Sequence, residues 1–263
     1  MMISVVIPCF NRANSIRESV LSVLSQKNSE YDLEVIVVDD GSTDNSLEVI
    51  SDLNVKIVST DGRKGACFAR NLGIKYAQGE WIAFNDSDDY WRIDKIKKIL
   101  NTIKNMNCTI DYIVHPFLRG YKNNFCTGGG ISKRDIFLER NNTLKRLLRK
   151  NFVSTQCLIV KRQALVSING FDNNLPRFQD WELAIRLSEN YNGYYISDCL
   201  AICMETKGSI STGFNKGIWA RKYILEKHYM LYKKNKFLLL CFKMNILLRE
   251  FFSKLNFRGI YEK

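Results

Sequence analysis

The 263-residue chain lacks the short motifs of several common enzyme classes. It has no Cys-x-x-Cys pair, and neither of its two histidines, His115 and His228, lies near a cysteine cluster, which disfavours a zinc site. It has no Gly-x-Gly-x-x-Gly and no Walker loop, which disfavours a dinucleotide oxidoreductase and a P-loop ATPase. Several of its eight cysteines stand in apolar runs, where reduced thiols act as small hydrophobes, so we expect a reducing cytoplasm.

Long hydrophobic runs are also absent. The N-terminus has no basic segment and meets Pro8 too early for a signal peptide. The longest apolar run near the C-terminus covers residues 237–242, far short of the roughly 20 residues that a membrane-spanning helix needs. We therefore expect a cytoplasmic protein without a transmembrane segment.

Positive charge is concentrated at the end of the chain. Residues 1–215 hold 27 Lys and Arg against 24 Asp and Glu, whereas residues 216–263 hold 12 against 3. This pattern predicts a basic tail near an anionic surface, rather than a generally basic protein. A nucleic-acid-binding module is the non-enzyme alternative, but the charge excess is confined to the tail, and we expect no nucleic-acid partner.

Strand and helix patterns alternate through residues 1–105, which predicts an α/β fold with a parallel, doubly wound sheet. We expect a capping box at Ser15 and Glu18. The helix predicted after Gly65 carries small residues on one side that permit close approach to the sheet. The second half is less regular, with strands expected at residues 112–115, 156–160, 194–197 and 200–204 and a helix from Gln179.

An acidic turn follows the apolar residues 81–84. Asp86, Asp88 and Asp89 fall within four residues, at a strand end, where open α/β sheets bind ligands. Crowded carboxylates repel one another unless a cation is present, and oxygen ligands suit Mg²⁺ or Mn²⁺. The alternative is an Asp-rich turn that only caps the next helix.

A series of motifs gives a more specific interpretation. They read Ser-Val-Val-Ile-Pro-Cys-Phe-Asn at residues 4–11, Val-Val-Asp-Asp-Gly-Ser-Thr-Asp at 37–44, Ala-Arg-Asn-Leu-Gly at 69–73 and Asp-Ser-Asp-Asp at 86–89. In this order, the chain resembles the family 2 glycosyltransferases of the GT-A fold, over about residues 3–190. Residues 169–172 and 179–182 resemble that family's Gly-Gly-Phe-Asp and Glu-Asp-Trp segments, with Asn169 and Gln179 as departures.

The resemblance implies a role for several residues at the expected nucleotide pocket. Pro8 and Asn11 would line this pocket, and Asp40 would contact the nucleobase. Asp86 would face the ribose or a metal ion. Arg70 is a candidate phosphate contact, because guanidinium groups pair well with phosphate.

The chemistry of the reaction would fall to two further carboxylates. Asp88, with Asp86, would bind Mn²⁺ or Mg²⁺ at the diphosphate, and Asp180 would be the general base of a single inverting displacement. Plainer readings remain open: Asp40 shapes an Asp-Gly turn, Arg70 is a solvated helix charge, and Asp180 only complements a helix dipole. Residues 207–211 are a candidate loop that closes over the donor.

The basic tail carries apolar residues at helical spacing from residue 237 onward: Leu240, Cys241, Met244, Leu247, Leu248, Phe251 and Leu255. This pattern fits an amphipathic helix in a membrane interface, or one that packs back on the catalytic domain. We divide the chain into a GT-A catalytic domain at 1–215, with a nucleotide-binding half at 1–105 and an acceptor-binding half at 106–215, and a helical tail at 216–263.

The expected function is transfer of a hexose, glucose or galactose, from a UDP-sugar to a saccharide on polyprenyl diphosphate in O-antigen or capsule synthesis. The enzyme would then work at the cytoplasmic face of the inner membrane as a peripheral protein. The alternative is a metal-dependent nucleotidyltransferase acting on a sugar phosphate. That class would show a Gly-rich, basic loop after the first strand, and residues 9–12 read Cys-Phe-Asn-Arg instead.

Overall fold

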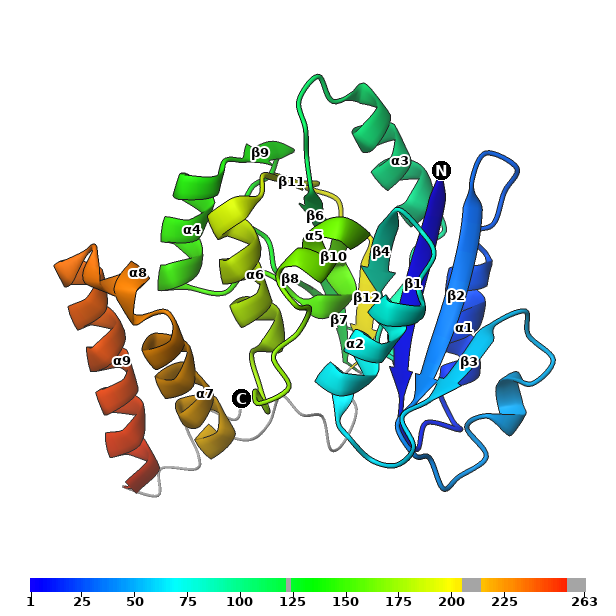
Figure 1. The fold of residues 1–263 in the computed structure, drawn as a ribbon, viewed down its shortest axis with the longest axis horizontal. Helices are drawn as coiled ribbons and strands as arrows, with labels where there is room; N and C mark the ends of the chain where they lie inside the picture. Colours follow the sequence, from blue (N-terminus) through cyan, green and yellow to red (C-terminus); the bar gives the residue numbers. More distant parts are fainter. Residues whose placement is uncertain (122–123, 205–213, 255–263) are drawn as a thin grey trace.

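The structure, a computed structural model, describes residues 1–121, 124–204 and 214–254. Its centre is an eight-stranded sheet with the order β3-β2-β1-β4-β10-β6-β11-β9 (Figure 1). The strands are β1 (Met2–Cys9), β2 (Asp32–Asp39), β3 (Lys56–Ser59), β4 (Trp81–Phe84), β6 (Tyr112–Val114), β9 (Ile136–Leu138), β10 (Leu158–Lys161) and β11 (Gly193–Tyr195).

Six of these strands share one direction. The strands β3, β2, β1 and β4 pair in parallel, and β10 runs antiparallel between β4 and β6. The strand β11 then pairs in parallel with β6, while β9 runs antiparallel at the edge. The expected α/β architecture, a mainly parallel sheet flanked by helices, is confirmed.

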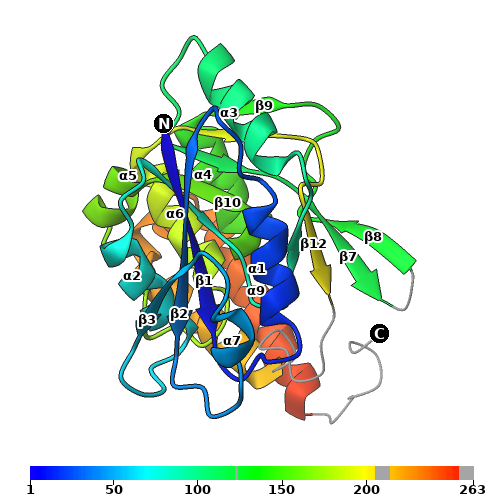
Figure 2. The same cartoon turned by 90° about the vertical axis from the view of Figure 1, so that its right-hand side faces the viewer.

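Alternate residues of each central strand enter two separate cores, because successive side chains of a strand point to opposite faces. Val6, Ile82 and Phe84 pack with α2 (Ala66–Tyr76), α4 (Arg140–Arg149), α5 (Arg162–Ser167) and α6 (Gln179–Asn190). Val5 and Ala83 pack on the other face with α1 (Ile16–Leu24) and α3 (Lys95–Asn105). Figure 2 shows these helices on the two sides of the sheet.

A second sheet of four short strands covers the α1 and α3 side, with the order β5-β12-β7-β8. Its strands are β5 (Tyr90–Trp91), β7 (Phe117–Tyr121), β8 (Asn124–Gly128) and β12 (Ala201–Met204). The sequence predicts β12 but not the other three, because runs this short, with polar or charged residues inside, show no clear period. Two 3₁₀ turns, η1 (Glu48–Ile50) and η2 (Thr155–Cys157), complete the domain.

Two local predictions have opposite outcomes. The capping box is wrong, because the Ser15 side chain makes no capping hydrogen bond at the start of α1. The close approach of α2 is confirmed: a Cβ atom built on Gly73 would lie 2.3 Å from Cγ1 of Val6 in the central strand β1. Glycine at this position therefore sets the distance between α2 and the sheet.

The tail forms three helices, α7 (Phe214–Lys227), α8 (Tyr229–Lys233) and α9 (Lys236–Lys254), beside α4 and α6 (Figure 1). Leu238, Phe242 and Ile246 bury one side of α9 in the catalytic domain's core, and the Phe242 ring lies 5.8 Å from that of Trp181. The opposite side of α9 exposes apolar side chains: Phe237, Leu240, Met244, Leu247, Leu248 and Phe251.

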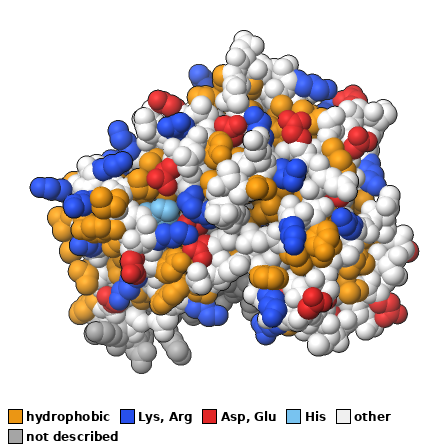
Figure 3. Space-filling view, in the orientation of Figure 1, with side chains coloured by type: hydrophobic (Ala, Val, Ile, Leu, Met, Phe, Trp, Pro, Cys, Tyr) orange, Lys and Arg blue, Asp and Glu red, His pale blue; other side chains and the backbone are white. Residues whose placement is uncertain are grey.

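We call these six exposed residues the α9 outer face. It contains five of the apolar positions that define the stripe in the sequence, so the helix packs through residues outside that stripe. Figure 3 shows hydrophobic side chains gathered on this part of the surface, with Lys and Arg around them. Among the described helices, none combines the length and the hydropathy that crossing a bilayer requires.

Candidate active site

The loops after β1, β2 and β4 meet at the carboxyl ends of these strands. Asn11, after β1, takes a left-handed backbone conformation with φ of 52°. Its side-chain oxygen accepts a 2.8 Å hydrogen bond from the Thr43 amide, and its own amide donates to Ser42 Oγ at 3.0 Å. Pro8 pairs with Val38 in the adjoining β-ladder. Both residues thus lie where the ends of β1 and β2 adjoin, and their contacts with a nucleotide stay predictions.

Asp40 is buried and holds the chain that leads into α2. One carboxylate oxygen accepts hydrogen bonds from Thr60 Oγ1 at 2.9 Å and from the Lys64 amide at 2.8 Å. The other oxygen accepts from the Gly65 amide at 2.8 Å. A carboxylate has about four acceptor positions. A nucleobase would therefore have to bind at a position that these three hydrogen bonds leave free. Asp40 therefore has a clear structural role, and the nucleobase contact stays a prediction.

Arg70 and Asp86 form an ion pair between α2 and the end of β4. Arg70 Nη2 lies 2.7 Å from Asp86 Oδ1, and the Arg70 side chain is 7% exposed. Burial excludes the reading of Arg70 as a solvated helix charge. Its Nε is buried with no hydrogen-bond partner among the described residues. A guanidinium near a strand end can bind a phosphate, and the phosphate contact of Arg70 stays a prediction.

The acidic turn gathers three carboxylates. Asp88 Oδ2 lies 3.6 Å from Arg12 Nη2, and its side chain is 17% exposed. Burial, together with the negative charges of Asp86 and Asp88, raises the pKa of Asp89 to about 8. Asp89 Oδ1 accepts a hydrogen bond from the Met204 amide at 3.1 Å, which ties the turn to β12.

Asp86 and Asp88 fit a divalent cation only as part of a shared site. Within the described ranges, no group of three or more His, Cys, Asp or Glu side chains could hold a metal ion alone. A Mg²⁺-type site in a nucleotide enzyme needs one or two carboxylates, with the substrate's phosphates and water as the other ligands. The partly exposed oxygens of these two residues meet that requirement, and the concentration of negative charge favours a cation.

Asp180 lies in the first turn of α6, close enough to the Arg70–Asp86 ion pair for both charges to affect its pKa. Burial, and to a smaller extent the charge of Asp86, raises its pKa to about 6. The Trp181 amide, Arg70 and Asn151 act in the opposite direction. Asp180 Oδ1 accepts hydrogen bonds from the Trp181 amide at 2.7 Å and from Asn151 Nδ2 at 3.3 Å. A carboxylate with a pKa near neutrality is suited to general-base catalysis.

Phe178, just before α6, adds a strained residue to this region. Its φ of 63° is in the left-handed region, which non-glycine residues rarely occupy. Strain of this kind costs of order 1–3 kcal/mol and persists where the surrounding structure imposes it. Two arginines surround the ring, with the guanidinium carbons of Arg177 and Arg221 4.9 Å and 4.4 Å from its centroid.

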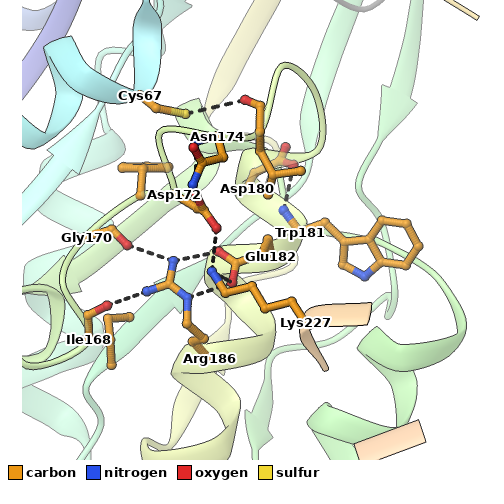
Figure 4. Close-up of polar contacts among 12 residues, drawn as sticks. Cys67, Ile168, Gly170, Asp172, Asn174, Asp180, Trp181, Glu182, Arg186 and Lys227 are labelled. Atoms are coloured by element: carbon orange, nitrogen blue, oxygen red, sulfur yellow. Dashed lines mark hydrogen bonds and ion pairs between the residues drawn. The ribbon is translucent and has the colours of Figure 1, made fainter. Parts of the chain in front are cut away.

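A buried charge network beside Asp180 does not follow from the motifs. Glu182 is fully buried and accepts hydrogen bonds from Arg186, and Lys227 Nζ lies 2.8 Å from Glu182 Oε1 and 2.5 Å from Asp172 Oδ2 (Figure 4). His228 Nε2 is 3.2 Å from the same Glu182 oxygen. Only the spacing of Glu182 and Arg186, four residues apart, could have indicated it from the sequence.

The candidate loop at residues 207–211 lies outside the described residues. The remaining predicted residues converge from distant parts of the chain. Asp86 and Arg70 meet at the end of β4, and Asp180 approaches them from α6 closely enough for their charges to act on its pKa. A guanidinium and two carboxylates thus lie near one another at the end of β4, and their roles in anion binding, cation binding and proton transfer stay predictions.

Comparison with known proteins shows which proteins this chain is similar to. WfgD of Escherichia coli, a UDP-Glc:alpha-D-GlcNAc-diphosphoundecaprenol beta-1,3-glucosyltransferase, is 28% identical over 80% of this chain and 79% of its own. The S. aureus TarS 1-349 structure with UDP-GlcNAc has a TM-score of 0.69 at 22% identity, covering 86% of this chain and 67% of TarS.

The mannosyltransferase PcManGT of Pyrobaculum calidifontis, solved with GDP-Man and Mn²⁺, has a TM-score of 0.60 at 19% identity, covering 87% of this chain and 64% of that one. Both solved structures share the GT-A fold with this chain. The family model named Glycosyl transferase family 2 matches residues 4–167, which is more than half of the sequence. The protein belongs to glycosyl transferase family 2.

Proposed function

We propose that this glycosyltransferase transfers a hexose, glucose or galactose, from a UDP-sugar to a saccharide on polyprenyl diphosphate, with inversion at the sugar carbon, in O-antigen or capsule synthesis. The observation that carries the proposal is Asp180, a carboxylate with a raised pKa beside the Arg70–Asp86 ion pair. UDP and a polyprenyl-linked acceptor are supported by what TarS is solved with and what the name of WfgD states. The family match leaves the nucleotidyltransferase alternative without support.

In this proposal, Asp180 accepts the proton of an acceptor hydroxyl. The acceptor oxygen attacks C1 of the sugar from the face opposite the phosphate, the bond from C1 to the phosphate oxygen breaks, and UDP leaves. Arg70, whose guanidinium lies beside Asp86 at the end of β4, would bind the diphosphate as its negative charge increases. A Mn²⁺ or Mg²⁺ ion, when held by Asp88 and Asp86 with the phosphates, would supply Lewis-acid stabilisation of the same charge.

The α9 outer face supports a position at the cytoplasmic leaflet of the inner membrane. These six apolar side chains point away from the catalytic domain, and Lys236 and Lys243 are exposed on the same helix. An apolar surface with neighbouring basic residues can lie at the boundary of headgroups and acyl chains. The tail beginning at residue 216 would then hold the enzyme where a lipid-linked acceptor is found.

The test is a transfer assay with a panel of nucleotide sugars, in Mn²⁺, Mg²⁺ or EDTA, using GlcNAc-diphosphate-alkyl as the acceptor. We expect turnover of one UDP-hexose, an inverted anomeric configuration by NMR, and loss of turnover in EDTA. Asp88→Ala should lower kcat strongly. The control is Asp32→Asn, which changes an exposed carboxylate at the start of β2, away from the end that leads to Asp40, and which should leave kcat unchanged. Binding of no nucleotide sugar under any condition would refute the proposal.

A further inference from the structure

A cavity of about 560 Å³ opens between α4, α6, α7 and α9, and Trp181 is the one residue of its described lining that belongs to a family motif. Its lining combines four cationic residues with three aromatic rings: Arg149, Lys150, Arg221, Arg249, Phe178, Trp181 and Phe242. No Asp or Glu side chain is among the described residues that line it. A hollow of this size with four positive charges is suited to a compact anion of high charge.

Two of the cationic groups lack carboxylate partners within the described part of the chain. Arg221 Nη1 donates to the Gly217 carbonyl at 3.1 Å, and Arg249 Nε donates to Asn245 Oδ1 at 3.0 Å. Neither is joined to an Asp or Glu by an ion pair there. Burial and the nearby charges of Arg249 and Arg177 lower the pKa of Arg221 to about 10. Positive charges that repel one another in a partly buried site favour an anionic ligand that would bind between them and neutralise them.

The cavity borders the candidate base. Asn151 lines the cavity and donates to Asp180 Oδ1 at 3.3 Å. Trp181 also lines it, and its amide donates to the same carboxylate oxygen at 2.7 Å. The indole is held in place, because Nε1 donates to the Leu147 carbonyl at 2.7 Å. A ligand bound here would therefore have one end next to Asp180.

The other boundary of the cavity is α9. Leu238, Cys241 and Phe242 contribute to the lining, and the α9 outer face lies on the same helix. A chain of apolar groups attached to an anion in the cavity would find hydrophobic surface directly along this helix. The Arg70–Asp86 ion pair, in contrast, acts on Asp180 from α2 and the end of β4.

We propose that this cavity binds the diphosphate of the lipid-linked acceptor, with the acceptor sugar at Asp180 and the lipid along α9. The inference rests on the proposed function and adds an acceptor site to it. Arginine presents a planar fork of donors that matches phosphate oxygens, and two such forks suit a diphosphate better than a single phosphate. Phe178 and Trp181 provide flat apolar walls for the first groups on either side of it.

The test is isothermal titration calorimetry of the full chain with farnesyl diphosphate, in saturating UDP and Mn²⁺ so that the donor site is filled. Hydrogen bonds from a charged donor to phosphate are each worth enough for about a tenfold change in affinity. We expect Arg221→Gln with Arg249→Gln to weaken binding of farnesyl diphosphate at least tenfold and to leave UDP binding within twofold. The control is Arg146→Gln, an exposed arginine of α4 that does not line the cavity, and it should bind as the wild type does.

Two further ligands show whether the cavity recognises the diphosphate, the apolar chain or a phospholipid headgroup. Farnesol tests the apolar chain alone, and dihexanoyl phosphatidylglycerol tests a lipid headgroup; both should bind at least tenfold more weakly than farnesyl diphosphate. Equal farnesyl diphosphate affinity in the wild type and the double variant, or equal affinity for phosphatidylglycerol, would overturn the inference. UDP binding separates a failure of the proposed function from a failure of the acceptor site. If the wild type does not bind UDP, the proposed function is contradicted. If it binds UDP but the double variant binds farnesyl diphosphate as tightly as the wild type, only the acceptor site is contradicted.

Discussion

At the scale of single residues, Asp180 shows how the fold adjusts a carboxyl group for proton transfer. Burial raises its pKa to about 6, while Arg70 and the Trp181 amide keep the charged form accessible. The charged groups acting on it also include Asp86, which raises the pKa, and Arg177, whose own pKa is affected by Asp180. A base must be deprotonated to act, so the raised pKa sets the lower limit of the working pH range.

We predict that kcat/KM decreases about tenfold per pH unit below about pH 6, because the protonated Asp180 cannot accept the acceptor's proton. Asp180→Asn should reduce kcat by about 10²- to 10⁴-fold, the range typical of a lost general base, and should remove this acidic limb. The measurement is a pH–rate profile of the free enzyme for both proteins. An unchanged limb in Asp180→Asn would assign the titration to another group.

At the scale of elements, α2 approaches the sheet most closely at a glycine. Gly73 is buried, and a Cβ there would approach Val6 Cγ1 to 2.3 Å and Val38 Cγ2 to 3.2 Å. The same helix carries Arg70 and begins at the backbone held by Asp40. Its distance from the sheet therefore also positions the candidate phosphate contact.

We predict that Gly73→Ala lowers the free energy of unfolding by about 1–3 kcal/mol, although alanine is the better helix former by about 1 kcal/mol. The clash with Val6 outweighs the helix propensity because both elements are fixed in the core. Urea denaturation gives the value, and Val6→Ala in the same chain supplies the control. The double variant should lose less stability than the sum of the two single changes. A stabilised Gly73→Ala protein would contradict the close packing.

The helix α9 has apolar side chains on two sides, and only one of them is packed. Leu238, Phe242 and Ile246 are buried, whereas the α9 outer face is between 47% and 73% exposed. An exposed apolar surface of this extent marks an interaction site in many proteins. The packed side fixes the helix on the domain and so presents the other side as a rigid surface.

We predict that replacing Leu240, Met244 and Leu247 by Gln abolishes flotation with vesicles that contain anionic lipid. The midpoint of thermal unfolding should stay unchanged, because the three side chains make no core contact in the structure. The control is Ile93→Gln, which removes an exposed apolar side chain next to α3, and which should float like the wild type. Equal flotation of the triple variant would mean that α9 is not the membrane contact.

At the scale of the whole molecule, buried charges join the tail to the catalytic domain. Burial alone would raise the Glu182 pKa, but hydrogen bonds from His228, Arg186 and Lys227 hold it well below its usual value. Because Lys227 and His228 belong to the tail and Glu182 to α6, the network couples the two regions. The division at residue 215 stays a prediction, although residues on both sides of it share one core.

We predict that Glu182→Ala lowers the free energy of unfolding at pH 7 by about 3–5 kcal/mol, because it leaves buried cations unpaired. A lowered carboxyl pKa stabilises the fold above the unfolded pKa of about 4.3, and this stabilisation is lost as pH falls towards the folded value. The difference between variant and wild type should therefore shrink below about pH 4. Urea titrations at pH 7 and below pH 4 measure it, and Glu226→Ala, an exposed glutamate of α7, should change little at either pH.

The sequence by itself determined the fold class and the family. Apolar strands and amphipathic helices alternate over the first 105 residues, and the motifs at residues 4–11, 37–44 and 86–89 lie at the ends of strands. Local patterns are sufficient here because the burial of a strand and the chemistry of its following turn are recorded in adjacent residues. The short strands β5, β7 and β8 could not be predicted from local patterns, because their pairing depends on partners far away in the chain.

Only the tertiary structure decided which distant groups meet. The burial of Arg70 against Asp86, the approach of Asp180, the Glu182 network and the cationic cavity all join residues from separate elements. The same holds for α9, where the sequence left packing and membrane contact as alternatives. The structure shows that a different side of the helix packs. The physical reason is that burial and charge coupling depend on distances through space, which no local pattern contains.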